Sequence, residues 1–111
     1  MKLLEEVRGH MRARHLAIRT EKAYLRWIER FLRFEKERRG DWVHPSLMGT
    51  DEVNRYLTHL AVEDNVSAST QTQALSALLL LFRDVLKTEI SFDAIRAKHP
   101  ETLPVKNQKG T

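Results

Sequence analysis

The sequence predicts an all-α protein, a bundle of four main helices. Apolar residues recur at steps of three and four in four segments, which is the spacing of a buried helical face. Short polar stretches and the breakers Gly40, Pro45 and Gly49 separate these segments, and the alternation typical of strands is scarce. A chain of 111 residues, 41% hydrophobic and 31% charged, suits a single domain with a modest core.

The first two helices are predicted within residues 2–39. The first runs from about Lys2 to His15. The second begins after Arg19, with Thr20 as its N-cap and Glu21 at the positive helix end. It ends in the charged run 35–39, because Gly40 suits the turn that follows a helix. The apolar positions of the two segments are Leu3, Leu4, Val7, Met11, Leu16, Tyr24, Trp27, Ile28, Phe31 and Phe34.

The other two helices follow a loop over residues 41–49. The third begins at Thr50, with Asp51 and Glu52 in its first turn. Ser67 is the expected N-cap of the fourth, since its hydroxyl can accept a backbone N–H of the first turn. We predict one shared core made of Tyr24, Trp27, Ile28, Phe31, Val53, Leu57, Leu60, Leu75, Leu78, Leu79 and Phe82.

The polar start of the fourth helix is the strongest functional signal. Ser69, Thr70, Gln73, Ser76 and Ala77 lie on a different side of the helix from its apolar residues. A helix anchored by its apolar end can place such side chains in a DNA major groove, where a glutamine can bond a base edge in two places. Its positive end also favours phosphate. The alternative is an ordinary core helix with a polar start.

Charge varies strongly along the chain. Residues 1–40 hold 12 basic and 6 acidic residues, whereas residues 41–95 hold 3 basic and 8 acidic ones. Residues 96–111 are basic again, with 4 against 1. This pattern indicates one face for a polyanion and another for solvent or protein.

The sequence contains no catalytic or metal-binding pattern. There is no cysteine, no glycine-rich phosphate loop and no G-x-S-x-G motif. The carboxylates are expected on solvent faces or in first turns. We expect no cofactor, no metal and no catalytic residue in this chain by itself. The histidines lie in separate segments without the spacing of a zinc site; they are His10, His15, His44, His59 and His99.

No stretch of the sequence suggests export or membrane insertion. The start, M-K-L-L-E-E-V-R, carries acids where a signal peptide needs an apolar run, and the longest apolar run covers only residues 77–82. We expect an intracellular, soluble monomer. The helical domain is predicted over 1–98, including a short helical piece around 92–97, and residues 99–111 form an extended basic linker.

Two segments together resemble a known family. R-T-E-K-A-Y-L-R-W-I-E-R-F-L-R-F (19–34) and the stretch over 48–86, in this order and spacing, resemble the N-terminal core-binding domain of tyrosine recombinases of the phage-integrase type. A-V-E-D-N-V-S-A-S-T-Q-T-Q-A-L-S-A-L and R-A-K-H-P-E-T-L-P-V are especially similar to integron integrases. The resemblance covers about residues 3–105. It implies a four- to five-helix orthogonal bundle with a SAM-like fold, forming half of a clamp around DNA.

The resemblance also sets expectations for activity and partners. In the family the domain that cleaves DNA would begin near residues 103–105, whereas this chain finishes K-N-Q-K-G-T. We therefore expect an excised or truncated DNA-binding half without cleavage activity. Its implied partners are recombination-site DNA, as a duplex or a folded single strand, and other recombinase protomers in the full-length protein. Its implied location is the bacterial cytoplasm, at the nucleoid.

The family lays its second and fourth helices across DNA, which implies contacts at the starts of both. Residues 19–22 combine cations, a hydroxyl and backbone N–H groups that can hold a phosphate. Residues 69–73 would lie in or beside the groove. Arg26, Arg30 and Arg33 are interpreted as a solvated face. The predicted DNA-binding residues are Arg19, Thr20, Lys22, Ser69, Thr70, Gln73, Ser76, Arg96 and Lys98.

Two other functional classes stay open. A helix-turn-helix regulator would suit the basic charge, but its turn is short and contains glycine, whereas the link before the fourth helix contains none. A protein-interaction bundle would use the acidic segment 41–95 as its working face. Salt-dependent DNA binding separates both DNA binders from the interaction bundle. Preference for recombination half-sites separates the two DNA binders from each other.

Overall fold

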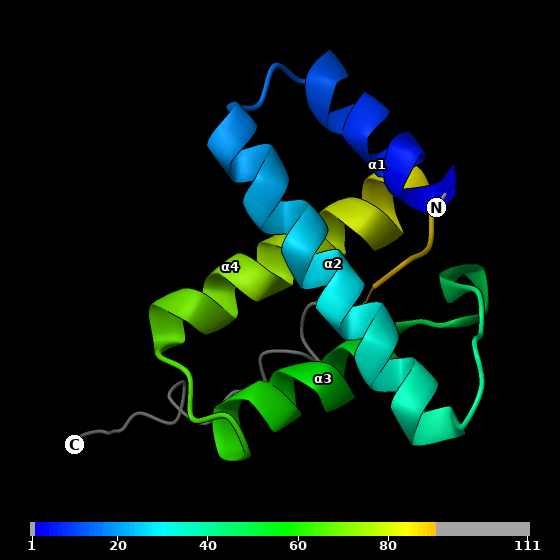
Figure 1. Ribbon diagram of the computed structural model, residues 1–111, viewed down its shortest axis with the longest axis vertical. Helices are drawn as coiled ribbons and strands as arrows, with labels where there is room; N and C mark the ends of the chain where they lie inside the picture. The colour runs from blue at the N-terminus through cyan, green and yellow to red at the C-terminus, as the bar shows by residue number, and fades with distance from the viewer. Residues whose placement is uncertain (1, 91–111) are drawn as a thin grey trace.

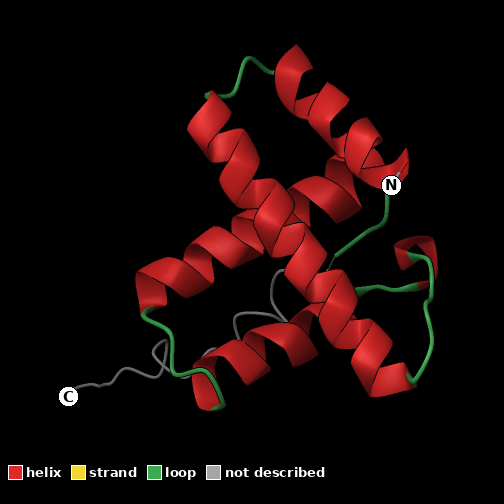
Figure 2. Cartoon of the chain, in the orientation of Figure 1, coloured by secondary structure: helices red, strands yellow, loops and turns green. Residues whose placement is uncertain are grey.

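The structure is a computed structural model that describes residues 2–90, and all regular structure in that range is helical (Figure 2). This confirms the predicted all-α class. The predicted helical piece at 92–97, the tail and the site residues Arg96 and Lys98 lie outside the described residues. The elements are α1 (Lys2–Ala13), α2 (Ile18–Arg39), the 3₁₀ turn η1 (Pro45–Leu47), α3 (Thr50–Val62), α4 (Ala68–Leu79) and the π-helical turn η2 (Leu80–Val85).

α2 is the longest helix and crosses in front of α4 at a steep angle (Figure 1). It packs on α1, α3 and α4, while η2, which continues α4 without a break, packs on α1. The rod formed by α4 and η2 therefore has α1, α2 and α3 as helical neighbours. This arrangement leaves one long face of α2 and one side of the first turns of α4 without a covering helix among the described residues.

The core lies where α2 crosses this rod. Phe31 packs edge to face on Phe82 of η2 and on Tyr56 of α3, with ring centroids 5.8 Å and 5.6 Å apart. Such aromatic pairs join three elements around one buried ring. Tyr24, Leu75 and Leu79 are only half-buried, which corrects their placement in the core. The predicted core residues confirmed as buried are Trp27, Ile28, Phe31, Val53, Leu57, Leu60, Leu78 and Phe82.

The buried side of the fourth helix is wider than its apolar spacing predicted. Ala74 and Ala77 are fully buried, although Ala77 was predicted on the polar side. Leu80 and Leu81 are also buried. The rod has neighbours on more than one side, and small alanine side chains let them approach closely. The π-helical turn also changes the helical phase after Leu79, so a constant period misplaces the residues that follow.

α2 begins earlier than predicted, which makes the assignment of Thr20 as its N-cap wrong. The N-cap is Ala17, without a side-chain hydrogen bond, and Thr20 lies inside the first turn. The preceding turn decides this start. His15 has a φ of 60°, and the N–H of Leu16 donates to the carbonyl of Met11 at 3.1 Å. The turn that follows α1 is therefore complete at Leu16, and α2 can begin at Ile18.

The two other predicted helix signals are confirmed. Ser67 caps α4, because its hydroxyl accepts the N–H of Thr70 at 3.1 Å. Gly40 ends α2 with a φ of 84°, and its N–H donates to the carbonyl of Lys36 at 2.8 Å. Both signals act within one helical turn, which is why the sequence alone predicts them.

Two carboxylates that were predicted on a solvent face or in a first turn are buried. Glu21 is 5% exposed and Glu35 is 1% exposed. Glu21 lies in the first turn of α2, as predicted, but it is buried there. It lies 3.7 Å from Arg8 and 3.5 Å from Arg12, so it joins α2 to α1. A buried carboxylate of this kind needs a cationic partner, which only the packing of two helices supplies.

The described residues show neither a membrane-spanning helix nor a metal centre. No helix within 2–90 is long and apolar enough to cross a bilayer. In the same range, no three side chains of His, Asp or Glu gather as they would around a metal ion.

Candidate nucleic-acid interface

Five cations follow one outward face of α2. Steps of three and four residues bring them onto the same face of the helix, opposite the buried residues Ile28, Phe31 and Glu35. All five are exposed. Glu37 continues the same face beyond them. We call this set the basic stripe; its members are Arg19, Lys22, Arg26, Arg30 and Arg33.

The basic stripe differs from six other arginines of the described residues in having no carboxylate partner there. Within residues 2–90, none of its five cations forms a salt bridge. Unpaired cations on one helix face create a local positive potential that attracts a polyanion. Six other arginines do form ion pairs: Arg8, Arg12, Arg14, Arg38, Arg39 and Arg55.

A second surface is formed by the start of α4. Ser69, Thr72 and Gln73 are exposed and Ser76 is half-buried, all on one side of the helix. We call these four residues the polar face of α4. Thr72 was missed by the sequence interpretation, although its three-residue step from Ser69 places it on this face. Thr70 does not belong to it, because its hydroxyl accepts a hydrogen bond from the capping Ser67 at 3.0 Å.

Trp27 joins the two surfaces. Its indole Nε1 donates a hydrogen bond to Oε1 of Gln73 at 3.0 Å. The guanidinium of Arg30 lies over the same indole, 4.8 Å from the ring centroid. Arg30 is therefore held against an aromatic ring rather than simply solvated. The basic stripe and the polar face of α4 thus form one continuous surface.

The start of α2 adds backbone groups to this surface. Arg19 and Lys22 are exposed there, and Thr20 is half-buried. Because the N-cap Ala17 supplies no side-chain acceptor, the N–H groups of the first turn are free of a side-chain cap. The structure thus brings together seven of the nine predicted DNA-binding residues on or beside α2 and α4, with Thr20 and Thr70 in supporting positions.

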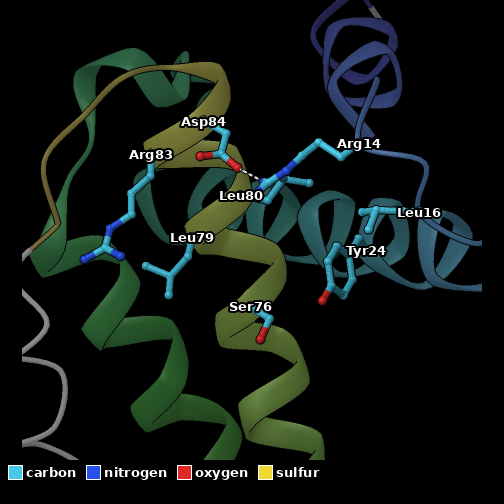
Figure 3. A pocket seen from close by; sticks show the side chains of 8 residues that line it. All are labelled: Arg14, Leu16, Tyr24, Ser76, Leu79, Leu80, Arg83 and Asp84. Carbon is cyan, nitrogen blue, oxygen red and sulfur yellow. Dashed lines mark hydrogen bonds and ion pairs between the residues drawn. The ribbon is translucent and has the colours of Figure 1, made fainter. Parts of the chain in front are cut away.

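A hollow of about 600 Å³ lies beside the polar face of α4 (Figure 3). An ion pair between Arg14 and Asp84 closes one side, and Tyr24 and Ser76 line the other. The lining holds a single carboxylate, which is paired, and no histidine. The hollow extends the polar surface of α4 through Ser76.

The comparisons with known proteins agree with this fold. Residues 3–91 match the family described as phage integrase, N-terminal SAM-like domain. Two relatives named integrase/recombinase, from Escherichia coli and Pseudomonas aeruginosa, are each 38% identical to the chain over 107 residues. The match covers 95% of this chain and 30% of each relative, so the chain spans about a third of their length. The chain belongs to the family of phage integrase N-terminal SAM-like domains.

Proposed function

We propose that this domain is the non-catalytic, DNA-clamping part of a tyrosine recombinase of the integron-integrase branch, and that it binds recombination-site DNA. The observation that carries the proposal is the basic stripe, whose cations lack carboxylate partners within residues 2–90, whereas six arginines on other faces are paired with carboxylates. Cations left unpaired along a single face are suited to phosphates.

The dimensions of α2 fit this role. The stripe spans the helix from Arg19 to Arg33, which is about 21 Å at 1.5 Å per residue. A major groove is about 12 Å wide, so a helix of this length can reach phosphates on both of its edges. The polar face of α4 adjoins the stripe through Trp27 and would then face the base edges. Phosphate contacts would position the domain, and α4 would add any sequence preference.

The comparisons support the recombination setting. Both relatives are named integrase/recombinase, and the remainder of their length has no counterpart in this chain. The assignment to the integron branch rests on the sequence resemblance of residues 61–78 and 96–105. In the full-length protein, we propose that the partners include other recombinase protomers and that the site of action is DNA in the bacterial cytoplasm.

Strand cleavage is not assigned to this chain. Burial raises the pKa of Tyr56 to about 12, which keeps its phenol protonated and is the opposite of what a nucleophile needs. We expect no covalent adduct between the chain and a nicked recombination site. A tyrosyl–DNA adduct on a denaturing gel would contradict this part of the proposal.

Fluorescence anisotropy with labelled duplex and hairpin DNA over a range of salt concentrations tests the proposed binding. We expect a dissociation constant in the roughly micromolar range or weaker at physiological salt, rising steeply with salt. Lys22→Gln or Arg26→Gln should weaken binding to all sequences and reduce the salt slope by about 1 each. Lys2→Gln removes the same charge from α1, outside the stripe, and should change neither quantity.

An NMR titration with DNA distinguishes this proposal from the alternative of a protein-interaction bundle. Chemical-shift changes during a DNA titration should cluster on the basic stripe and on residues 69–76. Changes confined to residues 51–64, with the stripe unaffected, would overturn the proposal. The acidic α3 would then be the better candidate for a working face.

A further inference from the structure

The hydrogen bond between Trp27 and Gln73 determines which end of the glutamine amide faces outward. An indole N–H is a donor only, so the atom that it contacts at 3.0 Å has to be the amide oxygen. Trp27 is 7% exposed, which holds the donor in a fixed position within the crossing of α2 and α4. The orientation of the Gln73 amide is therefore set by protein chemistry before any ligand binds.

The amide nitrogen is left as the outward group. Oxygen and nitrogen diverge from the same carbon, so Nε2 points away from Trp27 when Oε1 points toward it. Gln73 is exposed, and within residues 2–90 its Nε2 donates no hydrogen bond. The guanidinium of Arg30 lies over the ring of the same indole and is also a donor only. Trp27 therefore holds two outward groups, the Gln73 amide nitrogen and the Arg30 guanidinium, that donate hydrogen bonds and do not accept them.

We infer that Gln73 contacts a base edge made of acceptors, that of guanine, and that Trp27 is the positioning residue for this preference. The inference rests on the proposed function. In the major groove guanine presents two neighbouring acceptors, N7 and O6, whereas adenine presents an acceptor beside the N6 donor. A glutamine reads adenine by using its oxygen and its nitrogen together. Here the oxygen is turned to Trp27, so the pairing with adenine is disfavoured.

The test is selection of bound duplexes from a pool of random sequences at low salt, followed by sequencing. The wild-type chain should enrich guanine over adenine at one position by about fivefold, the low end for a base contact. Gln73→Ala should flatten that position only. Thr58→Ala, at an exposed threonine of α3 outside both surfaces, should keep the guanine preference and serves as the control.

Two further variants separate positioning from mere contact. Trp27→Phe keeps a ring but removes the indole N–H, so the amide can rotate and adenine should rise to match guanine. Gln73→Glu keeps an acceptor for Trp27 and turns a carboxylate oxygen outward, so the preference should move to the N4 donor of cytosine. The second variant tests the inference independently if the first does not fold.

The free protein offers a readout that does not involve DNA. The Trp27 indole N–H should exchange slowly with solvent in the wild-type chain and in Gln73→Glu, and faster in Gln73→Ala. An adenine preference in the wild-type chain, or a Gln73→Ala profile identical to that of the wild type, would overturn the inference while leaving DNA binding intact. Absence of binding to every sequence would instead overturn the proposed function, and the inference with it.

Discussion

Arg55 on α3 reaches the buried carboxylate of Glu35 on α2, with Nη1 and Oε2 3.4 Å apart. The same carboxylate lies 3.1 Å from Arg38 and 2.9 Å from Arg39. Glu35 is 1% exposed, whereas its three partners reach solvent. One carboxylate therefore contacts three guanidinium groups where α2 ends, and it ties α3 to that end.

Glu35→Gln should lower the free energy of unfolding by about 2–3 kcal/mol. The substitution keeps the shape of the side chain but removes the carboxylate that Arg38 and Arg55 contact, while Arg39 retains Glu52. Urea unfolding followed by circular dichroism measures the change. Glu37→Gln removes the same charge from an exposed position on the same helix and should change stability by less than about 0.5 kcal/mol. Equal losses in the two variants would contradict a structural role for Glu35.

Stability should fall at high pH because of Tyr56. Burial raises its pKa from 10.0 to about 12, with a smaller opposing effect of Arg30. A raised pKa stabilises the folded state fully below the unfolded value, and this contribution is lost as pH rises from 10 to 12. The free energy of unfolding should drop by at most about 1.4 kcal/mol per pH unit from this group.

The comparison of the wild-type chain with Tyr56→Phe isolates this effect. In Tyr56→Phe, the fall in the free energy of unfolding above pH 10 should be smaller by the contribution of Tyr56. The absorbance titration of this variant should also lack the phenol that ionises near pH 12 in the wild-type chain. The absorbance signal that is present in the wild-type chain and absent from Tyr56→Phe belongs to Tyr56. If this signal titrates near pH 10, the prediction is contradicted.

Two glycines provide a matched test of backbone conformation. A Cβ added at Gly40 or at Gly9 would meet nothing within 4 Å, so neither substitution to alanine creates a clash. Gly40 has a φ of +84°, a conformation that costs an L-residue about 1–2 kcal/mol. Gly40→Ala should therefore destabilise the protein by about 1 kcal/mol. Gly9→Ala, within α1, should stabilise it by about 0.5–1 kcal/mol. Thermal unfolding of both variants checks the opposite signs.

Two serines of α4 should separate stability from binding. Ser67→Ala removes the cap that accepts the N–H of Thr70 and should cost about 1 kcal/mol of stability. Ser69 lies on the exposed polar face of α4. Ser69→Ala should therefore change the free energy of unfolding by less than about 0.5 kcal/mol but weaken DNA binding. Calorimetry and anisotropy on the same samples measure both effects. If Ser67→Ala weakens DNA binding without loss of stability, Ser67 contacts DNA rather than capping α4, and the prediction is wrong.

The sequence by itself determined the helices, two of their ends and the family. The periods of three and four around Phe31, Leu57 and Leu78 arise from the geometry of a single helix, so they are readable without knowing its neighbours. The Ser67 cap and the Gly40 turn likewise depend on hydrogen bonds within one turn. The polar start of α4 was predicted for the same reason, because spacing alone brings Ser69, Gln73 and Ser76 onto one side.

Only the tertiary structure decided which polar groups are available. Glu21 and Glu35 look like surface residues in the sequence, yet each is buried and contacts at least one arginine from another helix. Gln73 looks free, but it accepts the indole N–H of Trp27, which lies 46 residues earlier in the chain. Ion pairs and hydrogen bonds between side chains of different helices depend on where the helices cross. The spacing of residues along the sequence does not predict where that happens. For that reason the unpaired basic stripe and the fixed amide of Gln73 emerge only from the packing of α2 against α1, α3 and α4.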